Sequence, residues 1–185
     1  KNGSIELKNK IDECLDHYIR ESDFGIRKKA NITDKYRHGK TSLGLKFTEV
    51  SLENENPSGI STNEPLALLF TIRINDTKIK LFTIGIHIYD PSENPVSTFI
   101  SKKYFVPDSD ENSFRVKVLL KNHNLTMGVY KMHFTLGLNN IGIDVIDYDV
   151  ISDVLSFDVQ YLEPKKPFIH WPRQYWGNIL LSDSE

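Results

Sequence analysis

The sequence contains a single cysteine, Cys14, so no internal disulfide framework can hold the chain together. It also has no apolar run near the roughly 20 residues that a membrane-spanning helix needs. Basic and acidic residues nearly balance, 23 against 25, which gives no electrostatic case for binding nucleic acid or an anionic membrane surface. The chain begins at Lys1 without the pattern of a secretory leader. We therefore expect a fragment of a longer protein from a reducing compartment.

The short motifs of catalysis, phosphate binding and metal binding are missing as well. No nucleophile elbow, zinc-type cysteine pair or glycine-rich phosphate loop is present. The segment His38-Gly39-Lys40-Thr41 imitates the end of a P-loop, but Asp34 occupies the position of the loop's first glycine. The six histidines are scattered at spacings that do not suggest metal ligation, so we expect no metal site and no cofactor in this chain. These absences favour a binding module over an enzyme.

What the sequence does contain is a regular series of β-strand patterns. The clearest is Phe82-Thr83-Ile84-Gly85-Ile86-His87-Ile88-Tyr89-Asp90, in which bulky apolar residues alternate with small, polar or aromatic ones. Similar patterns cover residues 43–52, 66–75, 96–105, 114–120, 130–136 and 155–161, whereas 139–150 resembles an irregular loop. We therefore predict an all-β chain with an immunoglobulin-like antiparallel β-sandwich over residues 43–163.

The two ends of the chain have a different character. Residues 1–25 carry apolar side chains at near-helical spacing and predict an amphipathic connector helix. Residues 26–42 are basic and poor in apolar residues, which favours a solvated linker over a phosphate-binding patch. Residues 164–185 form an aromatic arm, which either packs on its own sandwich or crosses to a second subunit. The residues expected to anchor this arm in a dimer are Trp171, Tyr175 and Trp176.

A candidate binding surface follows from projecting the alternation onto neighbouring strands. If the strands 82–90, 130–138 and 154–161 lie side by side, as the C, F and G strands of immunoglobulin-like sheets do, their outward residues share one face. The strand 96–105 extends this face, although its phase is ambiguous. The candidate carbohydrate-binding residues are His87, Tyr89, Phe99, Ser101, Lys131, His133, Thr135, Ser156 and Asp158. Aromatic and imidazole rings stack on sugar rings, while the polar groups match sugar hydroxyls. An ordinary solvated sheet face is the alternative for each single residue.

The order of several motifs resembles a known family. The motifs are Leu43-Gly44-Leu45-Lys46-Phe47-Thr48-Glu49-Val50, Thr62-Asn63-Glu64-Pro65-Leu66-Ala67-Leu68, Ile84-Gly85-Ile86-His87-Ile88-Tyr89-Asp90, Met127-Gly128-Val129-Tyr130, and Asp147 leading to Leu155-Ser156-Phe157-Asp158-Val159. Over about residues 24–161, this series resembles the C-terminal domain of the ATP-binding subunit of bacterial polysaccharide ABC exporters, the Wzt type. Met127 departs from the family, which commonly has proline before this glycine.

The resemblance implies an immunoglobulin-like sandwich that follows an ATPase domain, so that ATP and Mg would be needed only by that upstream domain. It implies a non-catalytic domain that recognises a completed and terminally modified O-antigen or related polysaccharide at its non-reducing end, for export. The implied partners are this glycan, a second copy in a homodimer with exchanged C-terminal segments, and the transmembrane exporter subunit. The implied location is the cytoplasmic side of the bacterial inner membrane. The alternative function is a structural β-sandwich that contacts a protein partner through an open edge or the aromatic arm.

Overall fold

The computed structural model describes residues 25–54, 59–62, 64–108, 111–139, 144–160 and 177–179. Within these ranges the chain forms ten β-strands and one short 3-10 helix, η1 (Asp34–Tyr36). The strands are β1 (Lys29–Asn31), β2 (Leu45–Leu52), β3 (Ile60–Ser61), β4 (Leu66–Ile74), β5 (Leu81–Tyr89), β6 (Pro95–Ile100), β7 (Tyr104–Phe105), β8 (Ser113–Leu120), β9 (Gly128–Leu138) and β10 (Ile146–Gln160). The expected connector helix and the arm residues Trp171, Tyr175 and Trp176 lie outside the described residues. No helix within the described ranges is long and apolar enough to cross a membrane.

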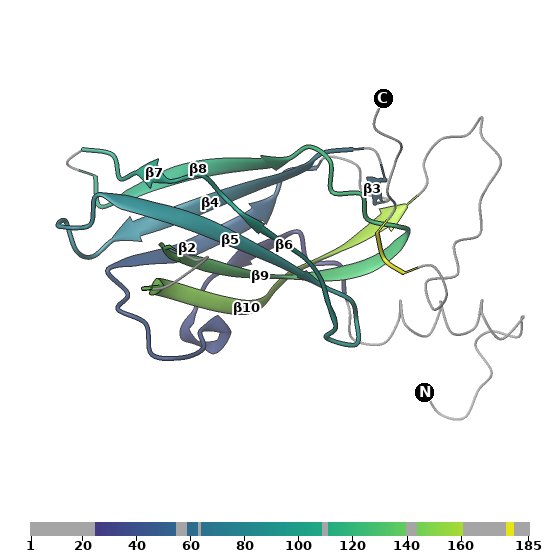
Figure 1. Cartoon of the computed structure of the whole chain (residues 1–185), viewed down its shortest axis with the longest axis horizontal. Helices are drawn as coiled ribbons and strands as arrows, with labels where there is room; N and C mark the ends of the chain where they lie inside the picture. The colour runs from purple at the N-terminus through teal and green to yellow at the C-terminus, as the bar shows by residue number, and fades with distance from the viewer. Residues whose placement is uncertain are drawn as a thin grey trace, which may run out of the picture.

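The strands form two sheets that lie one over the other (Figure 1). One sheet has the order β1-β2-β4-β8, and the other has the order β3-β10-β9-β5-β6. The short strand β7 pairs with the N-terminal end of β5, at Leu81 and Phe82. Every pairing is antiparallel except that of the short strand β3, which runs parallel to β10. The predicted all-β immunoglobulin-like sandwich is confirmed, and so is the predicted neighbourhood of the strands β5, β9 and β10.

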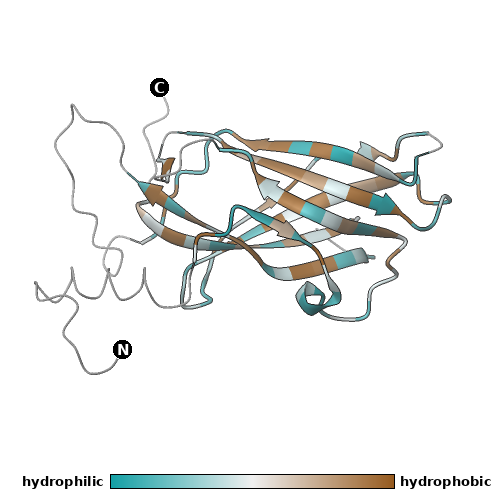
Figure 2. Ribbon diagram, turned by 180° about the vertical axis from the view of Figure 1, so that it is seen from behind, coloured by the Kyte–Doolittle hydropathy of each residue, from teal (hydrophilic) through white to brown (hydrophobic). Residues whose placement is uncertain are grey.

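Alternating side chains from both sheets fill the space between them. Figure 2 shows apolar and polar residues alternating along the strands, as expected when one face of each sheet is buried. Phe47 and Phe70 from one sheet meet Phe134 from the other, with the ring centroids of Phe70 and Phe134 5.2 Å apart and nearly perpendicular. Such edge-to-face pairs add to the free energy that burial alone provides. The apolar half of the strand 82–90 therefore faces this core, and the other half is left for the outer face.

A buried tyrosine fixes the entry to β9. The side chain of Tyr130 is fully buried, and its hydroxyl donates a hydrogen bond to the carbonyl of Thr126, 2.9 Å away. A tyrosine near the start of the corresponding strand, bonded to the backbone a few residues upstream, is a hallmark of immunoglobulin-like sandwiches. Because the Tyr130 ring is in the core, the alternate residues Lys131, His133 and Thr135 lie on the outer side of β9.

Most side chains of the stretch 26–42 are exposed, as expected of a solvated segment, but the prediction of a linker misses two attachments to the sandwich. Strand β1 pairs with β2, and Ala30 is buried at the seam. The Arg37 guanidinium reaches into the sandwich and binds the fully buried carboxylate of Asp149. The prediction failed because two strong contacts, a short strand pairing and a buried ion pair, leave almost no apolar signal in the sequence.

Two further strand boundaries differ from the prediction. The predicted strand 96–105 is divided into β6 and β7, because the chain leaves the ladder at Ser101. The hydroxyl of Ser101 accepts a hydrogen bond from the amide of Ile84, in place of a strand partner. The predicted loop 139–150 in turn contains the first five residues of β10. The strand was not predicted because the inward-facing position 149 is an aspartate, which breaks the apolar alternation. Asp149 points inward to Arg37 and to the amide of Phe47 rather than to solvent.

Candidate functional site

The outer face of the sheet β10-β9-β5-β6 brings together five of the predicted site residues. In the β5–β9 ladder His87 lies opposite His133 and Tyr89 lies opposite Lys131. Thr135 lies opposite Gly85, one pair further along the same face. The side chains of these residues are partly buried rather than fully exposed, so they form an ordered and partly accessible surface.

Two imidazoles and an aromatic ring form the centre of this face. The rings of Tyr89 and His133 stack with centroids 4.3 Å apart and planes 26° from parallel. His87 lies between two threonine hydroxyls, with Nδ1 3.2 Å from Thr98 Oγ1 and Nε2 3.4 Å from Thr135 Oγ1. Burial is the main cause that lowers the pKa of both His87 and His133. Both imidazoles are therefore neutral at neutral pH, and each presents one donor and one acceptor.

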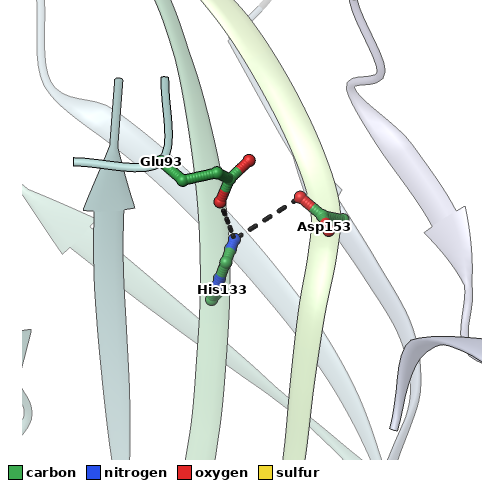
Figure 3. A group of neighbouring side chains, drawn as sticks. All are labelled: Glu93, His133 and Asp153. Carbon is green, nitrogen blue, oxygen red and sulfur yellow. Dashed lines mark ion pairs between the residues drawn. The ribbon is translucent and has the colours of Figure 1, made fainter. Parts of the chain in front are cut away.

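Three charged side chains surround the His133 end of the stack. The Lys131 ammonium binds the Glu93 carboxylate and lies 3.8 Å from Asp153 Oδ1. His133 Nε2 lies 3.9 Å from Glu93 Oε2 and 3.5 Å from Asp153 Oδ1, and Figure 3 shows the imidazole pointing between the two carboxylates. Nε2 is enclosed and has no hydrogen-bond partner. The nearby carboxylates work to raise the pKa of His133, but the effect of burial is larger.

Irregular backbone places both carboxylates. Asp153 lies in a bulge of β10, where the register shifts between Ile151 and Leu155, and its φ is +53°. Glu93 lies in the turn between β5 and β6 with φ +65°. Bulges commonly redirect a side chain next to functional sites, and left-handed backbone at a residue other than glycine, asparagine or aspartate is uncommon. The face is thus shaped by two local departures from regular strand geometry.

The turn that carries Glu93 is held by one aspartate. Asp90 Oδ1 accepts hydrogen bonds from the amides of Ser92 and Asn94, each at 2.9 Å. The Asp90 carbonyl also accepts a hydrogen bond from the amide of Glu93. Asp90 therefore orders the loop rather than facing a ligand, which is a common role of aspartate in turns.

Two predicted residues, Phe99 and Ser101, do not belong to this face. Phe99 pairs with the core-facing Ile86 and is 37% exposed, whereas Thr98 lies opposite His87. The phase was wrong because the β5–β6 register shifts between Ile88 and Tyr89. Ser101 is buried, and its hydroxyl is used by the backbone at the end of β6.

The two predicted residues on β10 lie on the expected side of the sheet but are already engaged. The Ser156 hydroxyl bonds to the carbonyl of Gly25 and the amide of Arg27, so the incoming chain covers it. Asp158 Oδ2 accepts a hydrogen bond from Gln160 Nε2, 2.7 Å away, whereas its Oδ1 is buried and has no hydrogen-bond partner among the described residues. Ser156 thus attaches the segment before β1 to the sandwich, and the open part of the face lies toward β9, β5 and β6.

Sequence reasoning missed three residues of this face: Thr98, Glu93 and Asp153. Thr98 could have been found by testing both phases of its strand. Glu93 comes from a turn and Asp153 from a bulge, so neither belongs to the period-two pattern that located the other residues. No local spacing links these two carboxylates to His133, because the three residues come from separate elements.

The sequence of this chain matches a known protein family. The family model described as the Wzt C-terminal domain matches residues 36–170, which is more than half of the chain. The chain belongs to the Wzt C-terminal domain family. The match includes the strands β2, β5, β9 and β10 that were singled out by their motifs, so the resemblance seen in the sequence is confirmed.

Solved structures give the same fold. A crystal structure of the C-terminal domain of wzt superposes with a TM-score of 0.53 at 17% sequence identity, covering 74% of this chain and 88% of that chain. A β-glucosidase from Listeria innocua in complex with gluconolactone has a TM-score of 0.40 at 17% identity and covers 64% of this chain but only 16% of the enzyme. The comparison with curated proteins finds no match. The crystal structure of the C-terminal domain of wzt therefore shares the fold of this chain.

Proposed function

We propose that this chain is a non-catalytic carbohydrate-binding domain that recognises a completed O-antigen or related polysaccharide on the outer face of β10-β9-β5-β6. Membership of the Wzt C-terminal domain family supports this role, since the family resemblance implies glycan recognition coupled to ABC-transporter export. Reading the terminally modified non-reducing end would let the domain distinguish finished chains from unfinished ones. The ATPase domain of the exporter would lie upstream in the longer protein.

The stacked pair of Tyr89 and His133 is the observation that carries the proposal. A flat, partly exposed ring surface of this kind matches the apolar face of a pyranose ring. The hydroxyls of Thr98 and Thr135 and the neutral imidazole of His87 lie beside it and match sugar hydroxyls as donors and acceptors. The Glu93 carboxylate at the edge can accept further hydrogen bonds from hydroxyl pairs.

The same proposal extends to partners and location. A homodimer formed through the aromatic arm, with Trp171, Tyr175 and Trp176 as anchors, would present two glycan-binding faces to one exporter. Contact with the transmembrane subunit through the ATPase domain would place this domain at the cytoplasmic side of the bacterial inner membrane.

Two single substitutions test the proposed face. Tyr89→Ala removes the stacking surface and His87→Ala removes the hydroxyl-matching imidazole, and we expect each to weaken glycan binding about tenfold. Calorimetric titration with the producing strain's own polysaccharide measures the change. Lys117→Ala is the matched control, because Lys117 is exposed on β8 of the opposite sheet and should leave the affinity unchanged.

The titrations distinguish an error in the proposed site from an error in the proposed function. Wild-type binding that neither Tyr89→Ala nor His87→Ala weakens would show that the glycan binds elsewhere on the chain. Absence of glycan binding by the wild-type protein would contradict the proposed function and favour a structural sandwich that contacts a protein partner.

A further inference from the structure

Glu93, His133 and Asp153 form a cluster in which two carboxylates face one imidazole nitrogen, whereas the proposed sugar contacts use the ring face of His133 and the outer edge of Glu93. Their candidate ligand atoms, two carboxylate oxygens and one imidazole nitrogen, all lie within 4.8 Å of one another. The three residues come from the β5–β6 turn, from β9 and from β10 and converge on one point (Figure 3). Small rotations of two partly exposed acidic side chains would bring these atoms to metal-ligand distances.

The His133 imidazole supplies the independent sign of a missing ligand. Its Nε2 atom has less than 1 Å² of accessible surface, is aimed between the two carboxylates and meets no acceptor at ordinary hydrogen-bond length, since the nearest, Asp153 Oδ1, is 3.5 Å away. Leaving a buried polar nitrogen without a partner costs about 1–3 kcal/mol, so such atoms are rare in folded proteins. The Tyr89 ring stacked on the imidazole holds it in this orientation. A cation on Nε2 would satisfy the atom without any movement of β9.

The position of the Lys131 ammonium shows that the two carboxylates attract a positive charge. It binds Glu93 and approaches Asp153, so one positive charge already lies against both carboxylates. The ammonium carries only donors and binds the carboxylates alone, whereas a metal ion would also take the Nε2 lone pair of the imidazole tautomer that is protonated at Nδ1. A metal ion would bind both carboxylates and Nε2 together, while the flexible lysine stem would let the ammonium swing away.

We propose that Glu93, His133 and Asp153 are the protein ligands of a divalent transition-metal cation, for which the Lys131 ammonium is the competing occupant. The mixed set of one nitrogen and two oxygen donors favours ions such as Zn²⁺, Co²⁺ or Mn²⁺ over Ca²⁺ and Mg²⁺, which prefer oxygen ligands alone. Three protein ligands leave coordination positions for water or for a hydroxyl-bearing ligand. The site stands on these residues alone and does not depend on glycan binding.

A calorimetric titration of the whole chain with Zn²⁺ alone tests the inference. We expect one Zn²⁺ per chain that Mg²⁺ does not displace, and a visible absorption band when Co²⁺ replaces Zn²⁺. His133→Ala should weaken this binding about tenfold or more, and Glu93→Gln and Asp153→Asn should each weaken it. His38→Ala is the control for non-specific histidine binding, because His38 is exposed and distant from the cluster in sequence.

Lys131→Met gives a prediction that an ordinary salt-bridge network does not share. Removing the competing ammonium should tighten Zn²⁺ binding, whereas an electrostatic network without a metal role would only lose stability. The proposal is overturned if the wild-type chain binds no Zn²⁺, if His133→Ala leaves the binding unchanged, or if Lys131→Met weakens it. Thermal unfolding of each variant without metal separates loss of ligation from loss of the fold.

Discussion

Gly85 lies at a point of close packing on the outer face that is proposed to bind the glycan. A methyl group at this position would collide with Thr135 Oγ1 and lie 3.1 Å from His87 Nε2 and 3.3 Å from Ile100 Cδ1. The absence of a side chain lets His87 and Thr135 approach each other across the ladder. The glycine is therefore required by the packing of its neighbours.

Gly85→Ala should both destabilise the sandwich and weaken ligand binding. We expect a loss of about 1–3 kcal/mol in the free energy of unfolding, which is typical of one methyl group forced into a packed position. Urea titration measures it. The double variant Gly85→Ala with Thr135→Ala removes the colliding hydroxyl and should recover part of the stability. Equal stability of the single variant and the wild-type protein would contradict this packing.

His123 has a defined protonation state. Its Nδ1 accepts a hydrogen bond from the amide of Leu125, so Nε2 carries the proton and donates to the carbonyl of Glu64. Burial lowers the pKa of His123, although hydrogen bonds to the backbone oppose that change. The folded state therefore holds a neutral imidazole that the unfolded chain protonates more readily.

The sign of the resulting pH dependence is fixed. Because the folded pKa of His123 is lower than the unfolded value, the unfolded state binds more protons as the pH falls below about 6.5, and stability is lost in that window. His87 and His133 act in the same direction. The urea concentration at the midpoint of unfolding should therefore decrease as the pH is lowered from about 7.5 to about 5.5. In His123→Asn, which retains an acceptor for Leu125, the fall should be smaller, and an unchanged fall would show that His123 does not contribute.

At the scale of elements, the segment before β2 holds the two sheets together. The Arg37 guanidinium binds Asp149 on β10 and also donates to the carbonyl of Phe47 on β2. Asp149 Oδ2 accepts a hydrogen bond from the amide of Phe47 as well. Burial raises the pKa of Asp149, while Arg37 and this amide oppose the rise. The buried carboxylate thus depends on Arg37 for compensation of its charge.

Arg37→Ala should be strongly destabilising, by about 3–5 kcal/mol, because it leaves an unpaired carboxylate in the core. The loss should be larger at neutral pH than in mild acid. Without Arg37 the raised pKa lets Asp149 become protonated as the pH falls, and protonation removes the unpaired buried charge. Asp34→Ala is the control, because Asp34 is an exposed partner of the same arginine and should cost at most about 1 kcal/mol. Similar losses in the two variants would contradict a structural role for the buried pair.

Elements with a regular period were predictable from the sequence, and irregular ones were not. β2, β4, β5, β8 and β9 have clean alternation, and their predicted bounds agree with the structure to within about two residues. The β5–β9 register brought His87, Tyr89, Lys131, His133 and Thr135 onto one face as predicted. Prediction failed where a bulge or turn changed the phase, at Phe99 and Asp153, because a single inserted residue moves every following side chain to the other face.

At the scale of the whole molecule, the outer faces of the two sheets carry different kinds of side chain. The sheet β1-β2-β4-β8 contributes apolar residues to the core and exposes ordinary charged residues such as Lys117 and Arg73. The sheet β10-β9-β5-β6 carries the stacked rings, the hydroxyls and the charged cluster on its outer face. Composition and net charge, which describe the whole chain, could not reveal this asymmetry, because it arises only once the strands are paired.

The most direct test of the account is an NMR titration of the wild-type chain with its own polysaccharide, beside the same polysaccharide lacking its terminal residue. The account predicts chemical-shift changes at Tyr89, His87 and His133 with the complete glycan and none with the truncated one. Shift changes confined to the opposite sheet, around Arg73 and Lys117, or no changes with either glycan, would contradict the claim that this outer face recognises a finished chain.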